Sequence, residues 1–307
     1  CDHNPPSPAY IDACDRLSKQ DKDEAFDMWR IANNPHDYHL YFDEWWQKDI
    51  ESMVLRDRNH PCVILWSIGN EIRDMETPPV IAVSKMLGEH IRKLDPARPV
   101  TAAVNGLRPA KDPFFATLDI GGYNYASGGD HLQGSMYPID HERVPGRIMV
   151  GTESYPLEAF SAWMDVLDYN YLIGDFVWTG FDYIGEASIG WRGYWQESNF
   201  YPWNLAYCGD IDICGWKRPQ SFYRDALWME NKISIFVKPP TPSFPENPDR
   251  QSWSKWHWHD VVADWNWPGQ ENKLMEVVVY SSCETTELFL NSGERIPRRL
   301  CRGVSEQ

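Results

Sequence analysis

The sequence has no run of about 18 apolar residues, the length that a helix needs to cross a bilayer, so it predicts no membrane span. Positive charge is scarce: 29 basic residues stand against 45 acidic ones, which gives a net charge of −16. This acidity argues against binding to nucleic acid and to anionic membrane surfaces. No glycine-rich phosphate loop follows any predicted strand, which weakens a nucleotide-binding interpretation.

Patterns that hold metals are also missing. The seven cysteines form no C-x-x-C pair and no other metal-ligand spacing, and their odd number argues against a full disulfide framework. Cys62 lies in an apolar segment and is interpreted as a small buried hydrophobic residue. The histidines add no ligand pattern, so we predict neither a metal site nor a cofactor.

One stretch of the chain stands out by its change of character. Residues 62–68 (Cys-Val-Ile-Leu-Trp-Ser-Ile) are almost all apolar, which is typical of a strand buried on both faces of a parallel sheet. Asn70 and Glu71 follow after one glycine and are therefore predicted at the carboxyl edge of the sheet, where barrel active sites lie. Taken alone, Glu71 would more often be a solvated loop acid.

Strands and helices alternate through the first two thirds of the chain. Further strands are predicted at 98–104, 118–125, 147–153 and 173–178, and helices at 9–17, 38–57, 77–94 and 157–171. This alternation predicts right-handed βα units and a parallel sheet, but it does not choose between a barrel and a doubly wound sheet. Glu153 ends one of these strands, so a second carboxylate is expected at the same edge as Glu71.

The stretch before Glu71 resembles the acid/base signature of glycoside hydrolase family 2, the β-galactosidase and β-glucuronidase family. The match runs Arg-Asp-Arg-Asn-His-Pro (56–61), the apolar strand, Trp-Ser (66–67) and Gly-Asn-Glu (69–71). His-Asn-Pro-Pro-Ser at 3–7 resembles the family's loop after the second barrel strand, and Gly-Thr-Glu-Ser at 151–154 resembles its nucleophile segment.

The resemblance implies an α/β fold in two domains. Residues 1–236 are expected to form a (β/α)8 TIM barrel whose first strand and most of whose second lie upstream of Cys1. Residues 237–307 are expected to form a proline-rich linker and part of an Ig-like β-sandwich, with strands at 275–280 and 286–291. Residues 18–23 depart from the family pattern: six polar residues stand where an apolar strand is usual, so we doubt that the third barrel strand forms normally.

The resemblance also implies the site and the reaction. The implied residues are Glu71 as general acid/base, Glu153 as nucleophile, and Asn70, Tyr125, Trp178 and His3 as substrate-binding residues. Tyr123 is the second choice for Tyr125, His3 stays open between a site and a loop role, and Asp182 is left open between a structural and a substrate role. The implied reaction is double displacement with retention, in which the neighbouring carboxylate keeps Glu71 protonated.

A carbohydrate is therefore the expected partner, and a terminal β-D-galactoside is the favoured one. The region around Lys217 lacks the Asn-x-Lys pair with which β-glucuronidases hold a carboxylate. The usual β-galactosidase histidine after the nucleophile is also missing, so β-glucuronidase, another family 2 exo-β-glycosidase and a catalytically impaired carbohydrate-binding fragment stay open. The resemblance favours a bacterial periplasmic or secreted location and leaves a homo-oligomer open.

Overall fold

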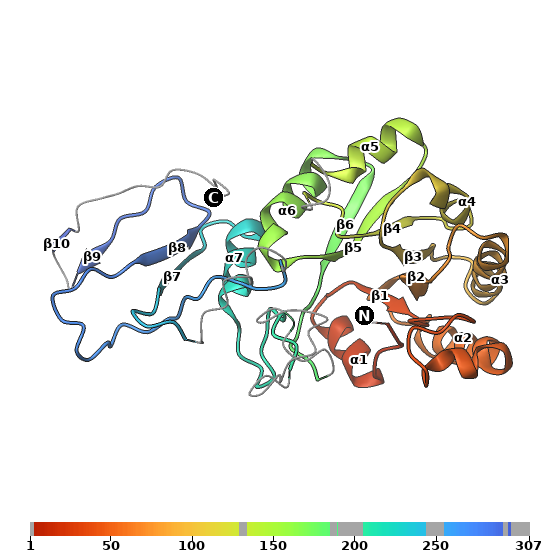
Figure 1. Cartoon of the computed structure of the whole chain (residues 1–307), viewed down its shortest axis with the longest axis horizontal. Coiled ribbons are helices and arrows are strands. Elements are labelled where there is room, and N and C mark those ends of the chain that lie inside the picture. The colour runs from red at the N-terminus through yellow and green to blue at the C-terminus, as the bar shows by residue number, and fades with distance from the viewer. Residues whose placement is uncertain are drawn as a thin grey trace. The chain divides into compact units, whose positions relative to one another are not determined.

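The computed structural model of the 307-residue chain describes residues 3–128, 134–184, 189, 205–243, 255–290 and 294–295. The chain divides into two compact units, Cys1–Thr179 and Gly180–Gln307, and each is described by itself (Figure 1). The domain boundary expected after residue 236 stays a prediction. Among the described residues, no helix combines the length and the apolar character that a membrane crossing requires.

The first unit is built on a six-stranded sheet. Its strands are β1 (Asp21–Glu24), β2 (Val63–Asn70), β3 (Val100–Val104), β4 (Gly121–Asn124), β5 (Met149–Ser154) and β6 (Leu172–Val177). Neighbouring strands pair in parallel, and their order in the sheet is the order of the chain. Successive parallel strands in this order are the arrangement of a TIM barrel, so the predicted barrel fold is confirmed for these six strands.

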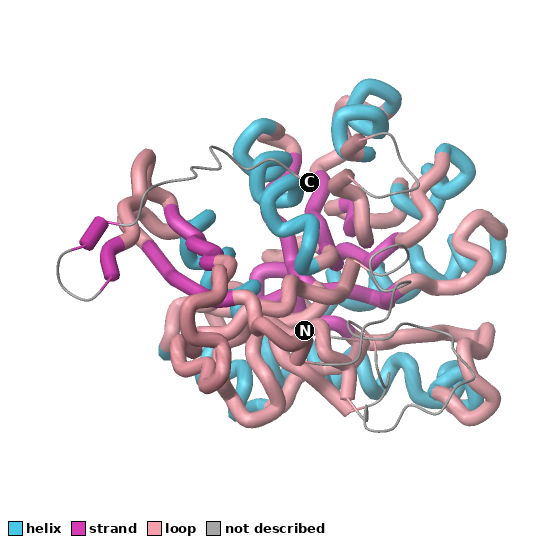
Figure 2. Tube along the Cα trace, turned by 60° about the vertical axis from the view of Figure 1, so that its left-hand side comes forward, coloured by secondary structure: helices cyan, strands magenta, loops and turns pink. Residues whose placement is uncertain are grey.

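Helices connect these strands and lie outside them (Figure 2). They are α1 (Pro8–Arg16), α2 (Phe42–Asp57), α3 (Pro78–Leu94), α4 (Asp112–Phe115), α5 (Met136–Arg143) and α6 (Ala159–Asp168), with 3-10 turns at Tyr38–Leu40, Pro109–Lys111 and Pro156–Glu158. Ser7 caps α1, because its side chain accepts a hydrogen bond from the Tyr10 amide. The apolar stripe of α3 is buried as its spacing predicts, at Val80, Val83, Leu87 and Ile91.

Strand β1 corrects one expectation. We doubted that the polar segment 18–23 could supply a barrel strand, yet β1 forms and pairs in parallel with β2, Asp23 opposite Trp66 and Glu24 opposite Ser67. All four of its residues are charged types, and all four are buried. The doubt rested on the cost of burying charge, which is large only when the charge is neither paired nor neutralised.

The two faces of β1 avoid that cost in different ways, because successive side chains point to opposite faces. On one face the Lys22 ammonium donates to a Glu24 carboxylate oxygen over 2.9 Å, and the Ser67 hydroxyl donates to the same oxygen over 2.6 Å. On the other face, burial and then the hydrogen bond and charge of the neighbouring Asp57 raise the pKa of Asp23 to about 9. Asp23 is therefore a neutral acid at pH 7.

The second unit contains α7 (Pro219–Trp228) and short antiparallel strands. β7 (Ile233–Val237) pairs with β8 (Val277–Ser281), and β9 (Phe289–Leu290) pairs with β10 (Glu294–Arg295). Phe236, Val261 and Tyr280 form its buried apolar cluster. Antiparallel strands here agree with the expected start of a β-sandwich, whose Ig-like character stays a prediction. Residues 244–254, which include the end of the predicted proline-rich linker at 238–245, lie outside the described residues.

Candidate active site

The two predicted carboxylates lie at the carboxyl ends of strands of the same sheet. Glu71 directly follows β2, and its amide donates to the Ala103 carbonyl on β3 over 2.9 Å. Glu153 is the penultimate residue of β5, and its carbonyl accepts the Tyr125 amide over 2.7 Å. Glu153 is 7% exposed, whereas Glu71 is half-buried, so the two acids meet different environments.

Backbone conformation is unusual at three of the predicted site residues. Glu71, Tyr125 and His3 have φ angles of 44°, 55° and 54°, in the left-handed region that non-glycine residues rarely adopt. Residues in such conformations concentrate at functional sites, where the surrounding structure holds them in place.

An asparagine that the sequence analysis did not single out holds Glu71. The Asn124 side-chain amide donates to a Glu71 carboxylate oxygen over 2.8 Å and to the Asn70 side-chain oxygen over 3.1 Å. The Thr152 hydroxyl donates to the Asn124 side-chain oxygen over 2.6 Å, which fixes the amide with its NH2 group toward Glu71. Asn124 is the last residue of β4 and the second-last of the predicted strand 118–125, and its polar side chain near a strand end was the available signal.

Tyr125, not Tyr123, is the tyrosine that contacts the second carboxylate. A hydrogen bond from its side chain lowers the pKa of Glu153. Tyr123 is fully buried elsewhere, where its hydroxyl donates to Asp140 over 2.9 Å and accepts from Arg147 over 3.0 Å. Alternation along a strand would place both tyrosines on one face, but Tyr125 follows the end of β4 with a φ angle of 55° and so leaves the strand conformation.

The proton shared by the catalytic pair lies differently from our expectation. Burial and then the negative charge of Glu71 raise the pKa of Glu153 to about 8, and these effects exceed the lowering by His3, Tyr125 and Lys22. We expected the proton on Glu71, but Glu153 is the more deeply buried acid and so loses more by ionising. Without substrate, Glu153 therefore carries a proton at pH 7.

His3 and Trp178 form one wall of the site. Their rings stack with centroids 4.6 Å apart and planes at 22°. Burial lowers the pKa of His3, but its hydrogen bond to Glu24 and the charges of Glu153 and Glu24 outweigh this and raise it to about 9. His3 is therefore a cation beside the nucleophile position.

Buried charges of alternating sign lead from β1 to this cation. The Glu24 carboxylate accepts the His3 amide over 2.9 Å and, through its other oxygen, the Lys22 ammonium over 2.9 Å. Burial alone would raise the pKa of Glu24, but Lys22 and His3 hold it well below its usual range. Lys22 and Glu24 were not predicted as site residues because their segment was treated only as a poor strand.

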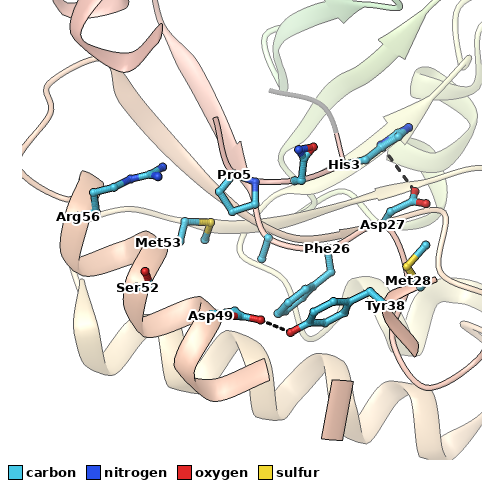
Figure 3. Close-up of a pocket in the computed structure, with 12 residues that line it drawn as sticks. His3, Pro5, Phe26, Asp27, Met28, Tyr38, Asp49, Ser52, Met53 and Arg56 are labelled. Atoms are coloured by element: carbon cyan, nitrogen blue, oxygen red, sulfur yellow. Dashed lines mark hydrogen bonds and ion pairs between the residues drawn. The ribbon is translucent and has the colours of Figure 1, made fainter. Parts of the chain in front are cut away.

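Asp27, in the loop after β1, also lies beside the predicted residues. The His3 Nδ1 atom is 3.8 Å from one of its carboxylate oxygens, and the Asn33 side-chain amide donates to its backbone carbonyl over 3.4 Å. Burial raises the pKa of Asp27, whereas His3, Asn33 and Asn70 lower it. Asp27 and His3 line a cavity of about 410 Å³, together with the stacked rings of Phe26 and Tyr38 (Figure 3).

Residues of the second unit that entered the sequence analysis have structural partners there. Asp182 forms an ion pair with Arg218 and accepts the Gly209 amide over 2.9 Å. Lys217 forms an ion pair with Asp225 and lies over the Phe222 ring. Among the described residues, no group of His, Cys, Asp and Glu has the arrangement of a metal site.

Comparison with known proteins gives the chain its family. Residues 3–126 match the family model of the TIM barrel domain of glycosyl hydrolases family 2. A crystal structure of a glycosyl hydrolase family 2 member from Bacteroides cellulosilyticus is 50% identical and covers 97% of this chain with a TM-score of 0.90. The chain belongs to glycosyl hydrolase family 2.

Two curated proteins similar to this family 2 chain carry different activities in their names. Beta-galactosidase BoGH2A of Bacteroides ovatus is 28% identical over 95% of this chain, and a putative beta-glucuronidase of Formosa agariphila is 28% identical over 94%. The chain spans 38% of the length of BoGH2A, 29% of the Formosa protein and 38% of the crystallised Bacteroides chain. The predicted family is thus confirmed, and the sugar is a separate question.

Proposed function

We propose that this chain carries the catalytic site of a retaining β-glycosidase that acts on terminal β-D-galactosides. The observation that supports this most is the coupled pair of Glu71 and Glu153, two carboxyl groups at the ends of β2 and β5. Hydrolysis of a glycosidic bond needs one carboxyl group that gives a proton and one that is ionised. Glu71 and Glu153 differ in burial and in their partners. Such differences move the pKa values of two like acids apart and so allow them different roles.

In the proposed first step the Glu153 carboxylate attacks the anomeric carbon as the glycosidic C–O bond breaks. Glu71 gives its proton to the departing oxygen, and an ester joins the sugar to Glu153. This step requires the shared proton to sit on Glu71. Tyr125 and His3 favour that state because both stabilise the ionised form of Glu153.

In the second step water replaces the leaving group. Glu71, now ionised, takes a proton from the water, which attacks the anomeric carbon and releases Glu153. Asn124 holds the Glu71 carboxylate in both steps through its 2.8 Å hydrogen bond. Trp178 offers a ring face beside His3 that suits the apolar face of a sugar.

Galactose is favoured over glucuronic acid by two observations. BoGH2A, similar over 95% of this chain, is named a beta-galactosidase. Lys217, the lysine closest to the glucuronidase pattern, is already paired with Asp225 in the second unit. The similarity to a putative beta-glucuronidase makes a β-glucuronide the second candidate substrate.

The test is hydrolysis of p-nitrophenyl β-D-galactoside and β-D-glucuronide by the chain and its variants. We expect turnover of the galactoside with retained configuration, a loss of about 10²–10⁴-fold in Glu71→Gln, and no turnover in Glu153→Gln. A 2-fluorogalactoside should label Glu153, which peptide mass spectrometry reads directly. The exposed acid Glu142 supplies the control, Glu142→Gln, which should keep the wild-type rate.

Three outcomes would contradict the proposal. Wild-type rates in both glutamine variants would remove the catalytic assignment. Inversion of configuration would remove the covalent step. Binding of galactose without any turnover would replace the hydrolase by the carbohydrate-binding alternative.

A further inference from the structure

We propose that Asp27, together with His3, binds hydroxyl groups of the sugar and thereby determines which sugar the site accepts. The inference rests on the proposed glycosidase function and adds to it a binding residue outside the catalytic pair. Asp27 was not among the residues expected from the sequence.

The carboxylate of Asp27 is partly open to solvent: its side chain is 33% exposed. The Asn33 side-chain amide donates to the Asp27 backbone carbonyl over 3.4 Å, and burial raises the pKa of the carboxyl, which Asn33 and Asn70 lower. An ionised carboxylate has about four acceptor positions, so this exposed group has room for further donors. A sugar hydroxyl is a donor that fits such a position.

The surroundings of Asp27 place it against the reacting end of the site. Asn70, which lowers the pKa of Asp27, directly precedes Glu71 in the chain. His3, 3.8 Å from it, stacks on Trp178 and acts electrostatically on Glu153. A sugar held on the Trp178 face at Glu153 would therefore turn its other hydroxyls toward His3 and Asp27.

A cavity of about 410 Å³ adjoins the two side chains on the side of α2. Its lining includes His3, Asp27 and the rings of Phe26 and Tyr38, and it does not include Glu71, Glu153 or Trp178, so it borders Asp27 and His3 without containing the catalytic pair. Figure 3 shows His3 and Asp27 directed toward one another at one end of this cavity.

A purely structural role fits Asp27 less well. The His3 Nδ1 atom is 3.8 Å from the Asp27 carboxylate, too far for a hydrogen bond. The His3 backbone amide already donates to Glu24 over 2.9 Å. Burial raises the pKa of Asp27, and this opposes leaving the acid without strong donors. A charged acceptor of this kind discriminates sharply, because a sugar without the matching hydroxyl leaves it unpaired.

The experiment is a cycle of one protein change and one substrate change. Wild-type chain and Asp27→Asn are assayed with p-nitrophenyl β-D-galactoside and its 3-deoxy, 4-deoxy and 6-deoxy analogues. Wild type should lose about 10- to 100-fold in kcat/KM with at least one analogue, the size of a hydrogen bond to a charged group. In Asp27→Asn this loss should shrink to about threefold or less. Each ratio is internal to one protein preparation, so a smaller folded fraction does not alter it.

Asp43→Asn is the matched control, since Asp43 is a 70% exposed acid at the start of α2 that pairs with Arg30. It should show the same deoxy-sugar losses as wild type. Equal losses in wild type and Asp27→Asn for every analogue would overturn the inference while leaving the glycosidase intact.

Galactose binding, followed by tryptophan fluorescence, separates this inference from the proposed function. If galactose binding weakens about tenfold or more in Asp27→Asn and no turnover is found, the role of Asp27 in sugar binding is supported. The proposed glycosidase activity is then refuted. A chain that neither binds galactose nor hydrolyses a galactoside would refute both.

Discussion

Replacing Asp23 by asparagine should make the chain more stable at pH 7 and should flatten the dependence of its stability on pH. Asp23 is 0% exposed on β1, and its pKa is raised to about 9 by burial and by Asp57. An unfolded aspartate titrates near pH 3.9. Between these values the folded chain keeps a proton that the unfolded chain releases, so stability falls as the pH rises.

The magnitude follows from the linkage relation. One proton of difference changes the free energy of unfolding by about 1.4 kcal/mol per pH unit. From pH 5 to pH 7, Asp23 should therefore remove about 3 kcal/mol of stability. Asparagine does not titrate and can still donate a hydrogen bond to Asp57, so Asp23→Asn should lack this loss.

The assay is urea unfolding followed by circular dichroism at pH 5, 6 and 7, with the slope against urea compared to confirm the same transition. Glu153 also has a raised pKa, but it titrates in both proteins and cancels in the difference. Asp12→Asn, at an exposed position of α1, should keep the wild-type pH dependence. An unchanged pH dependence in Asp23→Asn would show that Asp23 is ionised in the folded chain, and would refute the account of how β1 tolerates burial.

Two predictions concern catalysis. The pair of acids loses its shared proton near the Glu153 pKa of about 8, so kcat/KM of the wild-type chain should fall above that pH. Lys22 lowers the pKa of Glu153, so the fall in kcat/KM should move to higher pH in Lys22→Met. A fall at the same pH in Lys22→Met would disprove the electrostatic link. Asn124→Ala should lower kcat by about 10- to 100-fold with little change in KM, because Glu71 loses the donor that orients it. Steady-state kinetics at pH 6 measures both constants. An unchanged kcat would count against the role of Asn124.

The parts of the fold that follow from local pattern were predictable. β2 is a continuous apolar run, and α3 carries an apolar stripe between a proline at its first turn and Pro96 beyond its end, so both needed only the sequence. Resemblance, and not periodicity, selected the barrel over an open sheet. β1 was misjudged because the residues that stabilise its buried acids are distant in the chain. Ser67 donates to Glu24 from 43 residues away, and Asp57, 34 residues from Asp23, helps to keep Asp23 protonated. These residues become neighbours only in the folded sheet.

The site was predictable where a residue type at a strand end carries the chemistry, as for Glu71 and Glu153. It was not predictable where the role depends on register. Asn124 reaches Glu71 because β4 sets it opposite Glu153 on β5, and a shift by one residue would turn it to the other face. Asp27 depends on the path of a loop, for which the sequence offers no periodic signal.

The charged strand β1 also has a consequence for anyone who redesigns this protein. Lys22 and Glu24 resemble errors in a barrel core, and a stability-driven search would replace both by apolar residues. Yet Lys22 lowers the pKa of Glu153 directly, and Glu24 binds His3, which also lowers it, so a core rebuilt in this way would carry a nucleophile with a different pKa. The same residues of this strand therefore affect both the stability of the fold and the pH optimum, so a variant selected for one property must be measured for the other.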